Sequence, residues 1–277
     1  MNNKFAVFGN PIKQSLSPPI HQYFAKQLNL SITYDRRLSD ENNFAADIEE
    51  FFATGGNGCN VTAPFKEVAF SLCDELTESA SRAHAVNTLY ENDAGKLCGH
   101  NTDGVGLLKD LTVNLGLHLY NANIIILGAG GATRGILQPL IEQNPSSLTI
   151  VNRTLARATT LAAEFSDLYD ITTASSDNIP NDLPQTDLLL NATSASLDAK
   201  LPISDTSIIT SDTCCYDLSY SSKPTSFMTL CNNAGCSSNH DGRGMLVEQA
   251  AHSFTTWTSL EVDTRELIER FDSLKTD

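Results

Sequence analysis

The stretch that most limits the possible folds of this chain is an apolar run that ends in glycines. Residues 123–127 read N-I-I-I-L, and G-A-G-G-A follows at once at 128–132. A buried strand that enters a glycine-rich turn and then a helix is typical of a mononucleotide-binding unit, in which backbone N–H groups approach a pyrophosphate. The third glycine of the usual G-x-G-x-x-G pattern is absent, because Thr133 stands there. A glycine-rich turn without a ligand is therefore the alternative interpretation.

Alternating strand and helix patterns extend to both sides of this turn. After it we expect a helix to about residue 142, a strand at 147–151, a helix at 155–164, and strands at 170–174, 187–190 and 213–218. Before it we expect strands at 5–8, 32–38 and 58–62 and helices at 18–28, 44–53 and 65–72. Two more helices are expected at 244–257 and 264–274. Such alternation favours mostly parallel α/β sheets, and the order after the turn is that of a Rossmann-type domain.

The end of the second strand of this domain indicates which dinucleotide it binds. A unit that binds NAD usually has Asp or Glu there, which accepts hydrogen bonds from the ribose 2′-OH. This chain instead has Asn152-Arg153-Thr154, with Arg157 one helical turn later. Guanidinium groups suit a 2′-phosphate, which a carboxylate would repel. We therefore expect NADP rather than NAD; the alternative is that both arginines are solvated surface charges.

The overall charge excludes whole classes of partner. The chain has 277 residues, with 33 Asp and Glu against 18 Lys and Arg, for a formal net charge of −15. Such a chain is repelled by a nucleic-acid backbone and by an anionic membrane surface. The balance reverses at 128–157, which contains three arginines, Arg134 included, and one acid, whereas 158–240 contains two lysines and ten acids. This local excess of cations supports a phosphate-binding role for the arginines.

The cysteines and the apolar runs of the sequence indicate the cellular compartment of the protein. The seven cysteines are scattered, and they form no C-x-x-C motif and no Cys/His spacing typical of zinc. They are expected to be reduced thiols packed as small apolar side chains. The first residues do not read as a signal peptide, and nowhere do about 18 apolar residues run together. We expect a cytoplasmic protein without a metal site or a membrane partner.

Three polar patches of the first hundred residues follow predicted strands. The first holds Ser15 and Ser17 on a loop before a helix, the second is N-V-T-A-P-F-K at 60–66, and the third joins Asn87-Thr88 to G-H-N-T-D at 99–103. Each has an ordinary structural interpretation: a serine can cap a helix, Lys66 can be a solvated lysine, and Asn60 and Asn87 can be turn residues. A lysine in the first turn of a helix opposes the helix dipole, however, which favours a functional role for Lys66.

Nine ordered blocks together resemble the shikimate dehydrogenase family over nearly the whole chain. They are S-L-S-P at 15–18, N-V-T-A-P-F-K at 60–66, A-V-N-T at 85–88, N-T-D at 101–103, G-A-G-G-A at 128–132, N-R-T at 152–154, N-A-T-S at 191–194, Y-D-L-S-Y at 216–220 and D-G-R-G-M-L-V-E-Q at 241–249. The implied activity is the reversible, NADP-dependent reduction of 3-dehydroshikimate to shikimate in aromatic amino-acid biosynthesis.

The resemblance also assigns residues to roles. It implies that Lys66 and Asp103 form the catalytic pair and also contact the substrate, and that the hydroxyl groups of Ser15 and Ser17 hold the substrate carboxylate. Further substrate contacts would come from Thr62, Asn87, Tyr220 and Gln249. The implied cofactor contacts are Gly128, Ala129, Gly130, Gly131, Ala132, Asn152, Arg153, Thr154, Arg157, Leu218 and Gly242. A lysine suits the chemistry, because oxidation of an alcohol by hydride transfer requires a group that takes up the hydroxyl proton.

The implied architecture is a two-domain α/β protein. Residues 1–103 would form the substrate-binding and catalytic domain and residues 104–240 the Rossmann-like NADP domain. Residues 241–277 would be helices that return to the first domain. Assembly as a monomer or a homodimer is expected.

Two alternative functions stay open at this point. One is a paralogue that also accepts quinate and uses either NAD or NADP. The other is an NADP-sensing module without turnover, against which the intact Lys66 and Asp103 argue. The sequence also departs from the family pattern, because His84 and Ser196 stand where the family usually has glycine.

Overall fold

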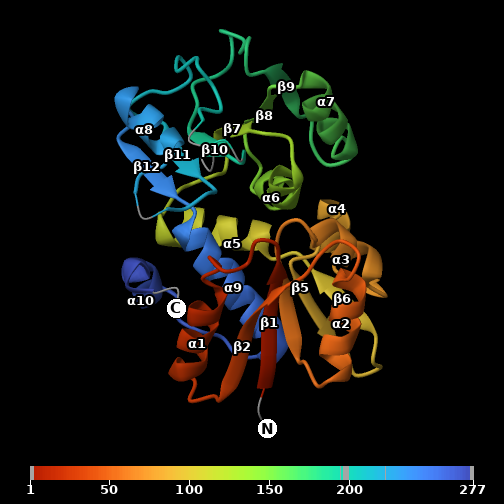
Figure 1. Ribbon diagram of the computed structural model, residues 1–277. Coiled ribbons are helices and arrows are strands. Elements are labelled where there is room, and N and C mark those ends of the chain that lie inside the picture. Colours follow the sequence, from red (N-terminus) through yellow and green to blue (C-terminus); the bar gives the residue numbers. More distant parts are fainter. Residues whose placement is uncertain (1–2, 194, 196–199, 222, 275–277) are drawn as a thin grey trace. The chain divides into compact units, whose positions relative to one another are not determined.

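The computed structural model of the protein describes residues 3–193, 195, 200–221 and 223–274. The chain forms two compact units (Figure 1): unit 1 comprises residues 1–106 and 246–277, and unit 2 comprises residues 107–245. The chain passes between the units within two helices, α5 (Asp103–Lys109) and α9 (Arg243–Thr258). Unit 1 is therefore discontinuous in sequence, and its last part begins inside α9.

Unit 1 is built on a six-stranded sheet of order β2-β1-β3-β5-β6-β4. Its strands are β1 (Asn3–Gly9), β2 (Ile32–Leu38), β3 (Gly58–Val61), β4 (Glu75–Leu76), β5 (Thr88–Glu91) and β6 (Leu97–His100). Its helices, besides parts of α5 and α9, are α1 (Ser17–Gln27), α2 (Phe44–Ala53), α3 (Lys66–Leu72), α4 (Glu78–Ala83), α10 (Arg265–Glu269) and a 3₁₀ turn at Phe271–Ser273. β5 runs antiparallel to both β3 and β6, so the sheet is mixed.

Both faces of the unit 1 sheet are covered because β1 is apolar on both sides. Ala6 and Phe8 pack into a cluster with Phe44 and Phe51 of α2 and with Phe65 next to α3. Phe5 and Val7 point to the opposite face and belong to a cluster against which Trp257 of α9 packs. Alternate residues of a strand face opposite sides of a sheet, and a strand buried on both sides reads as a continuous apolar run.

Unit 2 is a doubly wound parallel sheet of order β12-β11-β10-β7-β8-β9. Its strands are β7 (Asn123–Leu127), β8 (Ser147–Asn152), β9 (Thr172–Ser175), β10 (Leu188–Asn191), β11 (Cys214–Asp217) and β12 (Ser238–Asp241). A π-helical turn at Asp110–Asn114 continues α5, and the other helices are α6 (Gly131–Ile141), α7 (Leu155–Glu164) and α8 (Ser226–Asn233). The strand order reverses between β7 and β10, the point at which open α/β sheets bind ligands beyond the carboxyl ends of their strands.

Alternate residues of the unit 2 strands enter two separate cores. Ile124 and Ile126 of β7 pack with residues of α6 and α7, such as Leu137 and Leu161. Ile125 and Leu127 face the other side and pack with Phe227 and Cys231 of α8. Helices therefore cover both faces, as a sheet of parallel strands requires.

The predicted fold class is confirmed, with differences in the short strands and in the last helix. The strands β4, β5, β6 and β12 were not predicted, because they are two to four residues long and rich in polar or small residues. The helix expected at 264–274 is shorter, since α10 ends at Glu269 and only a 3₁₀ turn follows.

Within the described ranges, no helix combines the length and the apolar composition needed to cross a lipid bilayer.

Candidate active site

A close ion pair in unit 1 joins the starts of two helices. Lys66 is the first residue of α3, which follows β3, and Asp103 is the first residue of α5, which follows β6. The distance from Lys66 Nζ to Asp103 Oδ2 is 2.5 Å. The Asp103 side chain is 9% exposed and the Lys66 side chain 31% exposed. The ammonium group is thus held by a nearly buried carboxylate while it keeps access to solvent.

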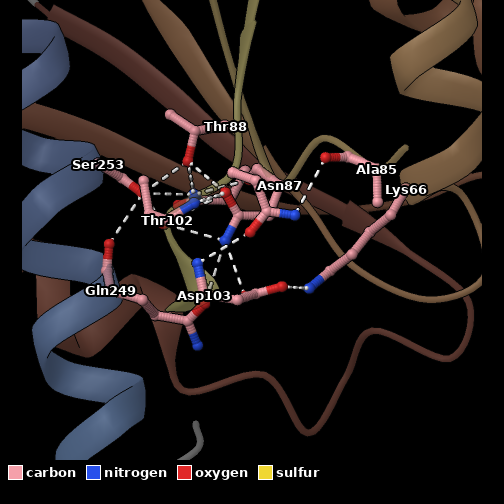
Figure 2. Close-up of polar contacts among 10 residues, drawn as sticks. Lys66, Ala85, Asn87, Thr88, Thr102, Asp103, Gln249 and Ser253 are labelled. Carbon is pink, nitrogen blue, oxygen red and sulfur yellow. Dashed lines mark hydrogen bonds and ion pairs between the residues drawn. The ribbon is translucent and has the colours of Figure 1, made fainter. Parts of the chain in front are cut away.

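Asn87 joins this pair to helix α9 (Figure 2). Its Nδ2 atom lies 2.9 Å from Asp103 Oδ1, 2.9 Å from Thr102 Oγ1 and 3.1 Å from Gln249 Oε1. Its Oδ1 atom accepts hydrogen bonds from the Thr102 N–H and from the Thr88 hydroxyl, each at 2.9 Å. Three acceptors surround a group with two protons, so acceptor capacity is left over at Asp103 and Gln249 for hydroxyl groups of a ligand.

A deeper polar layer fixes Asn87 in place. Asn60 Nδ2 donates to the Asn87 carbonyl and to Ser253 Oγ, both at 3.0 Å. The hydroxyls of Ser253 and Thr88 are 2.7 Å apart. Tyr34 is buried and donates to Asn60 Oδ1 at 2.7 Å, so side chains from β2, β3, β5 and α9 share one network. Asn60 and Asn87 are therefore network residues rather than turn residues.

The two predicted serines lie together at the start of α1, with Ser15 on the preceding loop and Ser17 as the first residue of the helix. Their Oγ atoms are 3.2 Å apart, and the residue that caps α1 is Leu16, without a side-chain hydrogen bond. Neither serine is the N-cap residue, although Ser15 Oγ accepts a hydrogen bond from the N–H of Ser17 at 3.3 Å. Thr62 follows β3, and its N–H donates to the carbonyl of Phe8 in β1.

The glycine turn of unit 2 leaves space that no described protein atom fills. Gly130 and Gly131 do not have positive φ, and a Cβ built on either would meet no protein atom within 4 Å. Neither backbone strain nor packing therefore requires glycine there, which fits a cradle for a phosphate group. Thr133, at the place of the missing third glycine, is buried and donates to the Gly128 carbonyl at 2.8 Å. This hydrogen bond holds the start of α6 close to the end of β7, although the third glycine of the usual pattern is absent.

A cavity of about 500 Å³ extends from this turn along the carboxyl ends of β8 and β9. Gly128, Asn152, Arg153, Thr154 and Arg157 all line it. Both arginines are exposed, and their guanidinium groups form no hydrogen bond or ion pair with described residues. The Thr154 hydroxyl makes no capping bond to α7. Two unpaired guanidiniums beside a hydroxyl suit the 2′-phosphate of NADP.

One arginine of the cation-rich stretch has a different role. Arg134 forms a two-bond ion pair with Glu164 of α7, an acid just outside the stretch counted in the sequence. The charge of Arg134 is therefore largely balanced within the protein. The local excess of positive charge rests on Arg153 and Arg157.

The remaining predicted contacts lie near the carboxyl ends of the last strands. Leu218 and Tyr220 follow β11 and are half-buried, and burial raises the pKa of the Tyr220 phenol. Gly242 follows β12, and its N–H donates to the Ser219 carbonyl. Ala129 lies in the glycine turn before α6, and Ala132 is the second residue of that helix. Ser196 lies outside the described residues.

Two charged residues near these sites were not predicted from the sequence. Arg36 of β2 donates from Nε to the Ser15 carbonyl at 3.0 Å, which brings a cation to the serine pair. Lys200 lines the cavity of unit 2 together with the acidic Asp177. No motif marks either residue, because each reaches its place through contacts between segments far apart in the sequence.

Three family models match the chain. Residues 7–89 match the shikimate dehydrogenase substrate binding domain, residues 111–205 match shikimate / quinate 5-dehydrogenase, and residues 242–270 match the shikimate 5′-dehydrogenase C-terminal domain. Curated relatives match along most of their length. The chain is 44% identical to shikimate dehydrogenase (NADP(+)) of Aeromonas salmonicida over 96% of both chains. It is 43% identical to that of Vibrio cholerae, over 96% of this chain and 94% of the relative.

Solved structures agree with this assignment. Shikimate 5-dehydrogenase from Thermus thermophilus, in complex with NADP(H) and shikimate, is 29% identical with a TM-score of 0.87, over 99% of this chain and 100% of that one. An Ael1 enzyme from Pseudomonas putida is 38% identical with a TM-score of 0.91, over 97% and 98% of the two chains. The protein described here belongs to the shikimate dehydrogenase family.

Proposed function

We propose that this chain is an NADP-dependent shikimate dehydrogenase, which interconverts 3-dehydroshikimate and shikimate. The observation that carries the proposal is the Lys66–Asp103 pair, 2.5 Å apart, with Asn87 on the other carboxylate oxygen. The relatives at 43–44% identity bear the same name. Substrate oxidation then removes a hydride and a proton from one secondary alcohol.

Lys66 and Asp103 handle the proton in this proposal. Lys66 Nζ keeps solvent access at 31% side-chain exposure, so it can lie within hydrogen-bond reach of a bound hydroxyl. In the reducing direction the ammonium group donates a proton to the oxygen that becomes the hydroxyl. Asp103 holds the ammonium group in position and has a second oxygen fixed by Asn87.

Hydroxyl and amide groups orient the substrate. We assign the carboxylate to the Ser15 and Ser17 hydroxyls, and the hydrogen bond from Arg36 Nε to the Ser15 carbonyl helps to hold this segment. Thr62, Asn87, Gln249 and Tyr220 are proposed as contacts for the ring hydroxyls. Asn87 and Gln249 are already hydrogen-bonded to each other, so their orientation is set before a substrate arrives.

The residues of unit 2 fit NADP. The space at Gly130 and Gly131 suits its pyrophosphate, and Arg153, Thr154 and Arg157 suit its 2′-phosphate. Ala129, Ala132, Asn152, Leu218 and Gly242 complete the proposed contacts. When bound, the cofactor supplies or accepts the hydride. Asn152 donates to the Thr154 carbonyl at 2.8 Å and so stabilises the turn that presents the arginines.

Initial rates with shikimate and quinate, each with NADP and NAD, test the proposal. We expect the highest kcat/KM for shikimate with NADP. Comparable rates with quinate and with NAD would identify the relaxed paralogue instead. Tight binding of NADP with no turnover of either substrate would identify a sensing module. The intact ion pair of Lys66 and Asp103 argues against the sensing module.

Two finer statements complete the proposal. We expect a cytoplasmic protein, since all seven cysteines are free thiols and five of them are buried. We also expect a monomer or a homodimer, which sedimentation of the purified chain would distinguish.

A further inference from the structure

Two buried polar residues that lie in the motifs of unit 2 have no role in the proposed chemistry. Asn191 ends β10 and Asp217 ends β11, and both are 0% exposed. The two strands are parallel neighbours with Asn191 opposite Asp217. Their side chains therefore lie at the carboxyl edge of the sheet, where β10 adjoins the strand that enters the glycine turn.

The Asp217 carboxylate is the centre of a hydrogen-bond network. Its Oδ1 atom accepts from Asn191 Nδ2 at 3.1 Å and from the Ser219 N–H at 3.0 Å. Its Oδ2 atom accepts from the Thr225 hydroxyl at 2.6 Å. A fully buried carboxylate needs such donors, because burial without them carries a large desolvation cost.

Through Asn191 the network reaches the segment after β10. Asn191 Oδ1 accepts from the Thr193 hydroxyl at 2.7 Å and from the Thr193 N–H at 3.1 Å. Thr193 lines the cavity of unit 2, and its methyl group would lie 3.0 Å from a Cβ at Gly128. The position of Thr193 is thus coupled to the glycine turn on one side and to Asp217 on the other.

Through Ser219 the network reaches the loop after β11. The Leu218 N–H donates to the Asn191 carbonyl at 3.0 Å, and the Gly242 N–H donates to the Ser219 carbonyl at 3.1 Å. A Cβ at Gly242 would lie 2.2 Å from the Leu218 carbonyl oxygen, so only glycine allows this approach of the two backbones. The two carbonyl groups that hold Leu218 and Gly242 thus belong to Asn191 and Ser219, and both of these residues donate a hydrogen bond to Asp217.

We propose that Asp217 is a positioning residue that holds the segment around Leu218 and Gly242 for the cofactor. The inference rests on the proposed function. Arg153, after β8, and Arg157, in the first turn of α7, take no part in the network. Their proposed contact with the 2′-phosphate therefore does not depend on Asp217. Loss of the carboxylate then impairs turnover while cofactor affinity stays nearly normal.

The variant Asp217→Asn tests this, because it keeps the side-chain shape and removes the charge. We expect kcat for shikimate oxidation to fall by about 10- to 100-fold, the effect of misplacing reacting groups by about 1 Å. The dissociation constant for NADPH, from fluorescence titration, should change little. Amide hydrogen exchange should become faster at 191–193 and 217–219 and stay unchanged in β8.

Asp110→Asn is the matched control. Asp110 is a carboxylate of the same unit, 3% exposed, that accepts from the Tyr216 hydroxyl at 2.7 Å and from Asn114 at 2.9 Å. This variant should lower the melting temperature and leave kcat nearly unchanged. If Asp217→Asn does not fold, the kcat values of two Thr225 variants are compared instead. Thr225→Val loses the hydrogen bond to Asp217, and Thr225→Ser keeps it.

Three results would overturn the inference: an unchanged kcat in Asp217→Asn, an equal loss of kcat in Asp110→Asn, or equal kcat values for the two Thr225 variants. A wild-type chain that did not oxidise shikimate would instead contradict the proposed function. Hydrogen exchange at 191–193 and 217–219 would in that case still decide whether Asp217 orders these two segments.

Discussion

Lys66 is the side chain on which the proposed chemistry depends most directly. Among the described residues of unit 1, its charged partner is Asp103, and no other lysine there joins the Asn87 network. A group that transfers a proton contributes about 10² to 10⁴ in rate. Substitution of Lys66 is therefore the sharpest test of the proposed mechanism.

Replacing Lys66 with alanine should lower kcat for shikimate oxidation by about 10² or more. The NADP dissociation constant should stay nearly unchanged, because the cavity lined by the arginines lies in unit 2. The measurements are initial rates and a fluorescence titration with NADPH. Lys96→Ala is the control, since Lys96 forms an exposed ion pair with Glu75 in the same unit. Near-normal turnover of Lys66→Ala would remove lysine from the mechanism.

His84 shows how one departure from the family pattern is accommodated. It ends α4 with φ of 46°, in the left-handed region, and its ring lies 5.5 Å from the ring of Phe70. The left-handed conformation is unfavourable for a residue with a Cβ by about 1–2 kcal/mol. The glycine that the family usually has at this position removes that cost.

The variant His84→Gly should therefore be more stable than His84→Ala by about 1 kcal/mol. Both variants lose the contact with Phe70, so their difference isolates the backbone conformation. Urea denaturation of the two proteins measures it. Equal midpoints and equal slopes would show that the left-handed conformation is not strained here.

At the scale of elements, the turn between β8 and α7 is the part of unit 2 that we propose selects the cofactor. It presents Arg153, Thr154 and Arg157 to one cavity, while Asn152 is occupied in holding the turn. No acidic residue stands at the end of β8, where a carboxylate would accept bonds from a ribose 2′-OH. The element as a whole therefore favours a phosphate over a hydroxyl group.

Arg153→Ala should raise KM for NADP far more than KM for NAD. A lost hydrogen bond to a charged group costs about 1.5–3 kcal/mol, which corresponds to roughly 10- to 150-fold in affinity. Initial rates at varied cofactor concentration measure both constants. Arg265→Ala, which removes an exposed arginine of unit 1, is the control for net charge. An equal effect on both cofactors would contradict the assignment of the 2′-phosphate.

The elements differ in how well the sequence predicts them. β7 and β8 were predicted within one residue, because they are continuous apolar runs that end in a turn. β5 and β6 were missed, since their short sequences, T-L-Y-E and L-C-G-H, mix polar with apolar residues and they pair antiparallel within a mostly parallel pattern. The family motifs predicted that Lys66 and Asp103 form a pair, whereas Ser253 and Arg36 lie outside every motif. These two reach their partners only through the packing of α9 and β2.

At the scale of a whole unit, an uncharged histidine in the core links stability to pH. His21 is 0% exposed, lies 4.5 Å from the ring of Tyr34 and 5.2 Å from that of Trp257, and neither ring nitrogen has a hydrogen-bond partner among described residues. Burial lowers the pKa of His21 to about 3, and the nearby Asn60 side chain offsets this only in part. The folded state therefore holds the neutral imidazole down to low pH.

Because the unfolded chain has the higher pKa, it binds the extra proton as pH falls below about 6.5, and stability is lost from there downward. At pH 5 the loss from His21 alone is about 2 kcal/mol relative to pH 7. His21→Phe should remove this part of the pH dependence. Urea denaturation of both proteins at pH 7 and pH 5 measures it. A variant with the same pH dependence as the wild type would show that His21 does not contribute.

The discontinuity of unit 1 also sets an order of events during synthesis on the ribosome. Asn60, Asn87 and Thr88 emerge early, whereas their partners Gln249 and Ser253 lie on α9 and emerge only after all of unit 2. Domains generally fold as units while the chain is made. The nascent protein can therefore complete its cofactor unit first, and its substrate-side network closes last. A chain released before α9 would lack Gln249 and Ser253, so an incomplete product would contain the Lys66–Asp103 pair without these two members of the Asn87 network.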